Sequence, residues 1–79
     1  MKLTLDIETT MAQDRIWCCG IQKEGEQRQR LLINSMQLEQ HLSGISDVIG
    51  HNITGFDAPK ISSLWNVSIP SHKLRDTVL

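Results

Sequence analysis

Near its N-terminus the chain carries the run Leu3-Thr4-Leu5-Asp6-Ile7-Glu8-Thr9-Thr10. Apolar and polar residues alternate along it, which predicts a β-strand with one face turned toward a core. Asp6 and Glu8 share the polar face, with their side chains about 7 Å apart at the base. Because a glutamate side chain is long and flexible, both carboxylates can reach one divalent cation or two neighbouring ones. The alternative is that the two acids mark the solvent-exposed edge where the strand ends.

Length and composition limit both fold and function. A chain of 79 residues forms one domain at most, close to the lower limit for a self-sufficient core. Hydrophobic residues make up 39% of the chain, and its aromatic residues are Trp17, Trp65 and Phe56. The net charge of −1 gives no basic patch, so composition neither predicts nor excludes a nucleic-acid partner.

Other features bear on the compartment and the context of the chain. Cys18 and Cys19 are adjacent, too close for an ordinary disulfide and without zinc-site spacing, so we expect free thiols in a reducing compartment. Lys2 is followed by too few apolar residues for a signal peptide, and no run is long enough to cross a bilayer. We therefore expect a cytoplasmic protein, or part of one, with no membrane partner. The β-prone residues 76–79 carry no turn signal, which predicts a chain cut from a longer one.

The rest of the chain alternates between strand-like and helix-like patterns. Besides residues 3–10, the predicted strands are residues 16–22, 29–33, 47–52 and 74–79. The strand at 16–22 is apolar on both faces, which predicts that both are covered. A strand that follows a helix lies parallel to an earlier strand through a right-handed crossover. The order β-β-β-α-β-α-β therefore predicts an α/β fold with an antiparallel meander extended by parallel strands.

Two helices are predicted from their caps and apolar spacing. Asn34 or Ser35 can cap the first helix, whose apolar positions are Leu38, Leu42 and Ile45. Gly44 is a plausible stop for it. Residues 53–55 are predicted to form a loop, and the second helix is predicted to begin near residue 57. Its apolar positions are Ile61, Leu64 and Trp65.

A third acid, Asp57, ends the run His51-Asn52-Ile53-Thr54-Gly55-Phe56-Asp57, where a strand leads into a helix. In open α/β sheets ligands gather in the crevice at the carboxyl ends of strands. If residues 47–52 pair beside the first strand, three carboxylates converge, and all-oxygen ligation suits Mg²⁺ or Mn²⁺. Two such ions about 4 Å apart are the usual equipment for phosphodiester cleavage. The alternative for Asp57 is a helix N-cap before Pro59, and for Asn52 a side-chain-bonded turn.

These runs resemble the motifs of a known enzyme family. Leu5-Asp6-Ile7-Glu8-Thr9-Thr10 is similar to the first motif, Asp-x-Glu, of the DEDD-type 3′→5′ exonucleases. The run from Asn52 to Asp57 is similar to their second motif, Asn-x-x-x-Phe/Tyr-Asp, with the frequent Pro59 after it. Leu74-Arg75-Asp76-Thr77-Val78-Leu79 resembles the Asp-Thr-Leu segment of proofreading domains. The chain most resembles the N-terminal exonuclease region of family A DNA polymerases of T7-like phages.

The resemblance implies a fold, a chemistry and a set of roles. It implies a ribonuclease H-like mixed sheet, with residues 1–79 as the N-terminal portion of a single, incomplete 3′→5′ exonuclease domain. It implies two Mg²⁺ or Mn²⁺ ions held by Asp6, Glu8 and Asp57, with Asp6 bridging both ions and Asp57 acting on the second, often through water. The positions implied to contact or orient the terminal nucleotide are Thr9, Thr10, Met11, Asn52 and Phe56.

The implied substrate is a single-stranded 3′ end of DNA, which needs metals and a narrow cleft more than a basic surface. The implied setting is a proofreading domain in the host cytoplasm, followed in the chain by a phage-type polymerase domain. Two alternatives remain open. One is a free-standing DEDD exonuclease acting on DNA or RNA, and the other is a non-catalytic remnant or nucleic-acid-binding module of the same fold.

The sequence departs from the family at its third motif, a Tyr or His followed by a fourth Asp on a later helix. His72 and Asp76 have suitable residue types, but they come too soon after Asp57. In a strand, positions four apart lie about 13 Å from one another. We therefore expect Asp76 to have a structural role and the 79-residue chain to be inactive alone.

Overall fold

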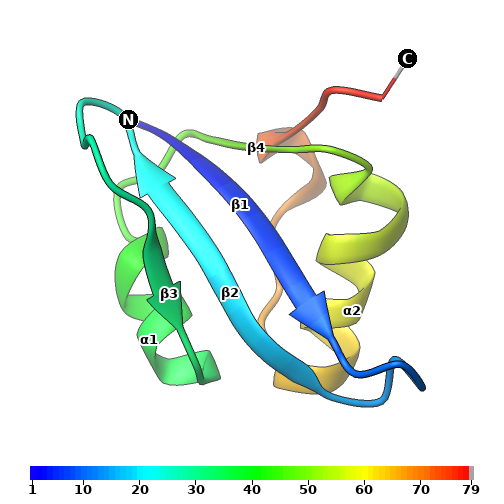
Figure 1. Cartoon of the computed structure of the whole chain (residues 1–79). Helices are drawn as coiled ribbons and strands as arrows, with labels where there is room; N and C mark the ends of the chain where they lie inside the picture. The colour runs from blue at the N-terminus through cyan, green and yellow to red at the C-terminus, as the bar shows by residue number, and fades with distance from the viewer. Residues whose placement is uncertain (79) are drawn as a thin grey trace.

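The computed structural model describes residues 1–78 as a mixed sheet with two α-helices. Its elements in chain order are β1 (Lys2–Thr9), β2 (Ile16–Lys23), β3 (Arg30–Leu32), α1 (Ser35–Leu42), β4 (Asp47–Gly50), a π-helical turn (Ile53–Asp57), α2 (Ala58–Trp65), a 3₁₀ turn (Ser71–Lys73) and β5 (Leu74–Asp76). The predicted order of strands and α-helices is confirmed (Figure 1). The predicted strand at 47–52 ends at Gly50 and the last one at Asp76, and position 79 lies outside the described residues.

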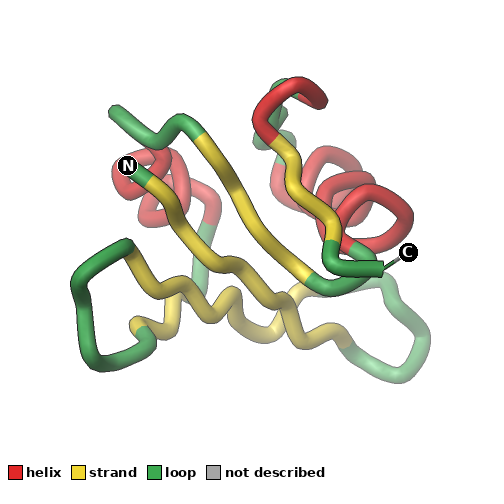
Figure 2. Tube along the Cα trace, turned by 90° about the horizontal axis from the view of Figure 1, so that it is seen from above, coloured by secondary structure: helices red, strands yellow, loops and turns green. Residues whose placement is uncertain are grey.

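The five strands form one sheet in the order β3-β2-β1-β4-β5. Neighbours β1, β2 and β3 are antiparallel, whereas β4 runs parallel to β1 and β5 runs parallel to β4. Figure 2 shows these strands in yellow, running side by side. The meander and the parallel extension expected from the sequence are both present.

Both helices cover the same face of the sheet. Each follows a strand and leads to a parallel strand further along the sheet, so right-handed crossovers place both on one side. The alternation along β1 turns its apolar residues to that side, where they pack with residues from both helices (Figure 1). The core residues are Leu3, Leu5, Ile7, Ile16, Cys19, Ile21, Leu32, Leu38, Ile45, Val48, Ile53, Ile61 and Val67.

The opposite face of the sheet is uncovered in residues 1–78. Trp17 of β2 and Leu31 of β3 are exposed, and Cys18 is half-buried. The prediction that the strand at 16–22 is covered on both faces fails at Trp17, whereas the other residues of β2 are buried or half-buried. Its apolar composition is that of a two-sided strand, but both crossovers deliver their helices to one side only.

The first helix begins and ends where the sequence indicates. The Asn34 side chain accepts a hydrogen bond from the backbone N–H of Gln37 at 2.9 Å, which is the geometry of an N-cap. The helix ends at Leu42, and Gly44 follows with a φ of +78°, a conformation that glycine adopts without strain. Ile45 lies beyond the helix and is still buried in the core. Among residues 1–78, no helix has the length and apolar character needed to cross a membrane.

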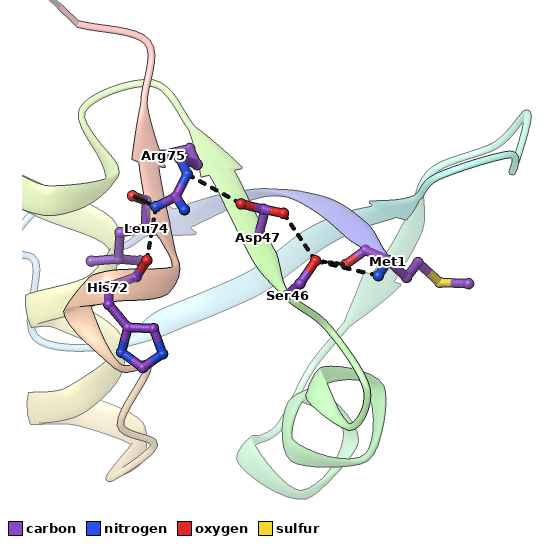
Figure 3. A network of polar contacts seen from close by, with 6 residues as sticks. All are labelled: Met1, Ser46, Asp47, His72, Leu74 and Arg75. Carbon is purple, nitrogen blue, oxygen red and sulfur yellow. Dashed lines mark hydrogen bonds and ion pairs between the residues drawn. The ribbon is translucent and has the colours of Figure 1, made fainter.

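A chain of polar contacts ties the N-terminus to the edge strand β5 (Figure 3). The Met1 amine donates to Oγ of Ser46 at 3.3 Å, and Ser46 Oγ donates to Oδ2 of Asp47 at 2.9 Å. Arg75 Nε lies 3.1 Å from the other carboxylate oxygen of Asp47. Exposed ion pairs of this kind contribute little energy. They accompany the pairing of β5 with β4, in which Arg75 lies opposite Ile49.

Candidate functional site

β1 presents Asp6 and Glu8 on the uncovered face of the sheet. Both side chains are exposed, as the alternation predicts, while Leu5 and Ile7 between and beside them are buried. In the register with β2, Asp6 lies opposite Gly20 and Glu8 lies opposite Cys18. The two acids are therefore neighbours on one face, open to a ligand from solvent.

Asp57 is only 3% exposed, and it reaches β1 from the other side of the site. Its Oδ2 accepts a hydrogen bond from the backbone N–H of Ile7 at 3.0 Å. This N–H is free because β4 pairs with β1 through Thr4↔Ile49 and ends one residue later, at Gly50. The Asp57 carboxylate takes the place of the strand partner that a longer β4 would supply. It is held against the backbone between Asp6 and Glu8.

A close approach of the backbone makes this arrangement possible. A Cβ on Gly50 would lie 2.9 Å from the carbonyl oxygen of Leu5 and 3.0 Å from Cβ of Ile53. Glycine therefore lets the chain turn away from β1 directly into the π-helical turn. That turn ends at Asp57 and brings its carboxylate to Ile7.

The electrostatics of the site are dominated by Asp57, a buried acid that lies near the negative charge of Asp6. Burial raises the pKa of Asp57, the negative charge of Asp6 raises it further, and the Ile7 hydrogen bond acts in the opposite direction. The Cys19 thiol, buried beneath the same strands, has its pKa raised to about 12 by burial and by the charges of Asp57, Cys18 and Asp6. Negative potential therefore concentrates where Asp6 and Asp57 meet, which favours a cation there.

The three predicted ligands are not all gathered in one cluster. Within residues 1–78, no group of three His, Cys, Asp or Glu side chains is arranged to hold a metal ion. Asp6 is close enough to Asp57 to raise its pKa, and Glu8 is not among the charges that do so. The charges of Asp6 and Asp76 both raise the pKa of Asp57, while Glu8 is exposed on the same strand as Asp6.

The structure contradicts the alternative that Asp57 caps the second helix and the prediction of a loop at residues 53–55. Asp57 is not a helix N-cap: it has helical φ and ψ of −62° and −50°, and its side chain makes no cap hydrogen bond. Residues 53–55 are not a loop, because they belong to the π-helical turn that runs into α2. The cause is tertiary, since Ile53 is fully buried and Asp57 is drawn to β1.

The predicted substrate-binding residues border the acids on two sides. Thr9 and Thr10 are half-buried at the end of β1, and Met11 is fully exposed in the turn that follows. The Thr10 hydroxyl donates to Oδ1 of Asp14 at 2.7 Å. Phe56, in the π-helical turn, is half-buried against the core.

Asn52 occupies the turn at the start of the π-helical segment. Its φ of +56° places it in the left-handed region, which asparagine tolerates better than most residues. Its backbone carbonyl accepts from the N–H of Phe56 at 2.9 Å, and its side chain makes no cap hydrogen bond. Asn52 therefore shapes the turn through its backbone, with its side-chain amide beside Gly55.

Asp76 has the structural role expected for it. Its carboxylate accepts backbone N–H bonds from Asn52 at 2.8 Å, Thr54 at 3.0 Å and Val78 at 2.9 Å. These hydrogen bonds lower the pKa of Asp76. They fix the first residues of the segment that ends at Asp57.

Sequence reasoning missed Trp17 as a residue of this region. Its indole is 71% exposed, and Trp17 lies in β2 where the register with β1 shifts between Glu8 and Thr9. The exposure of Trp17 could not be predicted from the apolar run between Ile16 and Ile21, because a shift in strand register does not change the hydrophobicity pattern. The neighbouring Cys18-Cys19 pair is confirmed as free thiols.

Comparison with known proteins adds no relative. No protein-family model matches the chain, and neither a curated protein nor a solved structure matches it.

Proposed function

We propose that this chain forms the acid-bearing part of a 3′→5′ exonuclease domain with a ribonuclease H-like fold. The observation that carries the proposal is the 3.0 Å hydrogen bond from Ile7 N–H to Asp57. It holds the acid of the second motif against the backbone that joins the two acids of the first motif. This contact supports a site that Asp57 shares with Asp6 and Glu8, although about 50 residues separate it from them in the chain.

The sheet supports the ribonuclease H-like part of the proposal. Its order β3-β2-β1-β4-β5, with an antiparallel meander extended by two parallel strands, is the arrangement that the resemblance implies. β1 lies at the centre of the sheet, so β2 flanks Asp6 and Glu8 on one side, and beyond the end of β4 the Asp57 carboxylate lies on the other. The end of β4 opens onto the same place, where ligands gather in sheets of this kind.

The donor set suits Mg²⁺ or Mn²⁺, because these ions prefer carboxylate oxygens. Asp6 and Glu8 would hold metal from the open face, and Asp57 from the end of the π-helical turn. When bound, such ions supply an activated hydroxide and stabilise the leaving oxygen. The residues of this chain position the ions and neutralise their charge, while a bound cation relieves the raised pKa of Asp57.

Metal binding is the direct test. We expect Mn²⁺ added to the ¹⁵N-labelled chain to broaden the amide signals of residues 6–8 and Asp57 first. Asp6→Asn should abolish this local broadening, whereas Glu39→Gln, which removes an exposed acid of α1, should leave it unchanged. Broadening that is centred elsewhere, or that persists in Asp6→Asn, would contradict the proposed site.

Cleavage by the 79-residue chain alone should be slow or absent. The third motif has no counterpart, and Asp76 is engaged with backbone N–H groups instead of the acids. A 3′-labelled single-stranded DNA incubated with the chain and Mg²⁺ should remain intact. Rapid degradation that is abolished by Asp6→Ala would show that three acids suffice and would refute the expected inactivity.

Two alternatives are separated from the leading proposal by specific results. A non-catalytic binding module is favoured by the lack of a three-residue metal cluster in residues 1–78, and it predicts no Mn²⁺ effect at Asp6. A free-standing exonuclease predicts that the gene continues only far enough to add a Tyr/His-x-x-x-Asp helix. A proofreading domain predicts that motif followed by several hundred codons of polymerase, so the gene downstream of codon 79 distinguishes the two.

A further inference from the structure

Trp17 is a large apolar side chain left in water beside the acids. In the register of β1 and β2, Glu8 pairs with Cys18 but Thr9 pairs with Ile16, so Trp17 is the additional residue of an irregular step. Neighbouring strands lie about 5 Å apart, which places the backbone of Trp17 directly beside that of Glu8 and Thr9. The indole therefore projects from a point next to the proposed site.

The exposure of this indole is a property of its position. Trp65, the other tryptophan, packs against the core from the end of α2, as a large aromatic residue ordinarily does. Trp17 is 71% exposed in the middle of an otherwise apolar run. Irregular steps of this kind occur often beside active sites, where they redirect a side chain.

We propose that Trp17 is a stacking platform for the base of the nucleotide held at Asp6 and Glu8, an inference that rests on the proposed function. Asp6, Glu8 and the cations that they would hold can bind the phosphate of the nucleotide, but they make no contact with its base. With a net charge of −1, the chain has no excess of basic side chains to bind the DNA phosphates. An exposed indole supplies the missing contact, because every base has a face that stacks on it, whatever the sequence.

The platform is specific for single-stranded ends. At a paired end the terminal base exposes only its outer face and is held in place by its partner strand, so it cannot rotate onto the indole. A frayed 3′ end offers a free base face, which the indole can cover while the phosphate lies at the acids. This places the specificity for unpaired ends in Trp17 and leaves the carboxylates to hold the metal.

Fluorescence gives a direct readout of the stacking. In Trp65→Phe, Trp17 is the remaining indole, and we expect its emission to be quenched by oligothymidylate in the presence of Mg²⁺. Trp17→Ala should weaken binding about 5- to 150-fold, as measured by anisotropy of a 5′-labelled oligonucleotide. Trp17→Phe should retain most of the affinity, and Trp65→Phe should retain all of it. Circular dichroism should show that each variant is folded. We expect Trp17→Ala to fold because the side chain that it removes is mostly exposed.

A double-mutant cycle identifies the partner of the indole. An oligonucleotide with an abasic 3′-terminal residue should lose affinity by a factor similar to that caused by Trp17→Ala. Combining the two changes should cost no more than either alone, because each removes the same contact. Independent, multiplicative losses would overturn the stacking assignment.

The failure of stacking differs from the failure of the proposed function. If Mg²⁺-dependent binding is lost in Asp6→Asn but unchanged in Trp17→Ala, the stacking inference is wrong and the metal site stands. If Mn²⁺ binds at Asp6 but no oligonucleotide quenches Trp17, the inference is also wrong, and a protein partner for the indole takes its place. If neither metal nor oligonucleotide binds, both proposals fail.

Discussion

At the scale of single residues, Asp57 combines two opposed properties. Its carboxylate satisfies the Ile7 N–H, which would otherwise be an unpaired donor at the end of the sheet. The same carboxylate is 3% exposed and lies near the charge of Asp6, so its ionised form is disfavoured and its pKa is raised. A structural acceptor needs no charge at this position, whereas a metal ligand does. The charge is therefore a cost to stability, which the Ile7 hydrogen bond offsets in part and a bound cation would offset further.

Substitution at Asp57 separates these properties. Asp57→Asn keeps an oxygen for Ile7 and removes the charge, so we expect the free energy of unfolding at pH 7 to be equal to that of wild type or higher. Asp57→Ala leaves the Ile7 donor without its partner and should lower that free energy by about 1–3 kcal/mol. Urea unfolding of the three proteins without divalent cations measures both effects. A destabilised Asp57→Asn would show that the charge itself is required for folding.

The pH dependence of the same proteins has a definite sign. Because the pKa of Asp57 is higher in the folded chain, its protonated form stabilises the fold, and this contribution is lost as pH rises from the ordinary aspartate range through the raised value. In Asp57→Asn, the free energy of unfolding should not fall over this pH range, because residue 57 no longer titrates. Its advantage over wild type should therefore be greatest at neutral pH and should vanish in acid.

At the scale of elements, the π-helical turn at residues 53–57 depends on a strand that comes later in the chain. Asp76 of β5 accepts N–H bonds from Asn52 and Thr54, and the Asp47–Arg75 ion pair holds β5 against β4. The turn carries Asp57 at its other end. β5 therefore helps to position Asp57 through its hydrogen bonds to the beginning of the π-helical turn.

Removal of the Asp76 acceptors should loosen that turn. We expect Asp76→Ala to lower the melting temperature and to speed amide hydrogen exchange at Asn52 and Thr54. The effect should be smaller in Asp76→Asn, which keeps one of the two acceptor oxygens and replaces the other with an NH2 group that cannot accept. Since the pKa of Asp76 is lowered by these hydrogen bonds, its stabilisation is present above the ordinary aspartate pKa and is lost as pH falls through the lowered value. The difference between wild type and Asp76→Asn should therefore narrow in acid. Unchanged exchange at Asn52 would contradict this role.

The same element shows where sequence reasoning reached its limit. The strand at 3–10, the cap at Asn34 and the parallel placement of β4 follow from local alternation, cap chemistry and crossover handedness, and each is confirmed. The loop predicted at residues 53–55 is instead the start of a helical turn, which Ile53, Thr54 and Gly55 do not favour by their own propensities. Their helical turn is produced by the burial of Ile53 and by Asp76, a partner more than twenty residues away. No local pattern contains that information.

At the scale of the whole molecule, both helices lie on one side of the sheet, and Asp6 and Glu8 lie on the other, open face. The alternation of residues 3–10 predicted that Asp6 and Glu8 share a face. It did not predict that this face is bare, because composition does not reveal on which side the helices lie. A ligand can approach Asp6 and Glu8 without any movement of α1 or α2. Cation binding should therefore stabilise the fold that already exists.

Thermal unfolding with Mg²⁺ tests that expectation. At about ten times its Kd, a ligand that binds only the folded chain adds about 1.4 kcal/mol, and about 1 kcal/mol shifts the melting temperature of a domain this small by about 4–8 °C. The shift should be present at pH 7.5 and disappear near pH 4, where protons compete for the carboxylates. Na⁺ at equal ionic strength is the control for screening, and Asp6→Asn is the control for the site. An equal shift in Asp6→Asn would place the cation elsewhere.

The bond between Ile7 and Asp57 has one more consequence, for spectroscopy. An amide proton that points at a carboxylate resonates further downfield when that carboxylate is ionised than when it is neutral. The Ile7 amide is thus a built-in reporter: one cross-peak follows the protonation of Asp57 and responds when a cation draws charge from it. Because Ile7 is itself buried, its chemical shift reports the charge of Asp57 without any substrate or catalytic turnover.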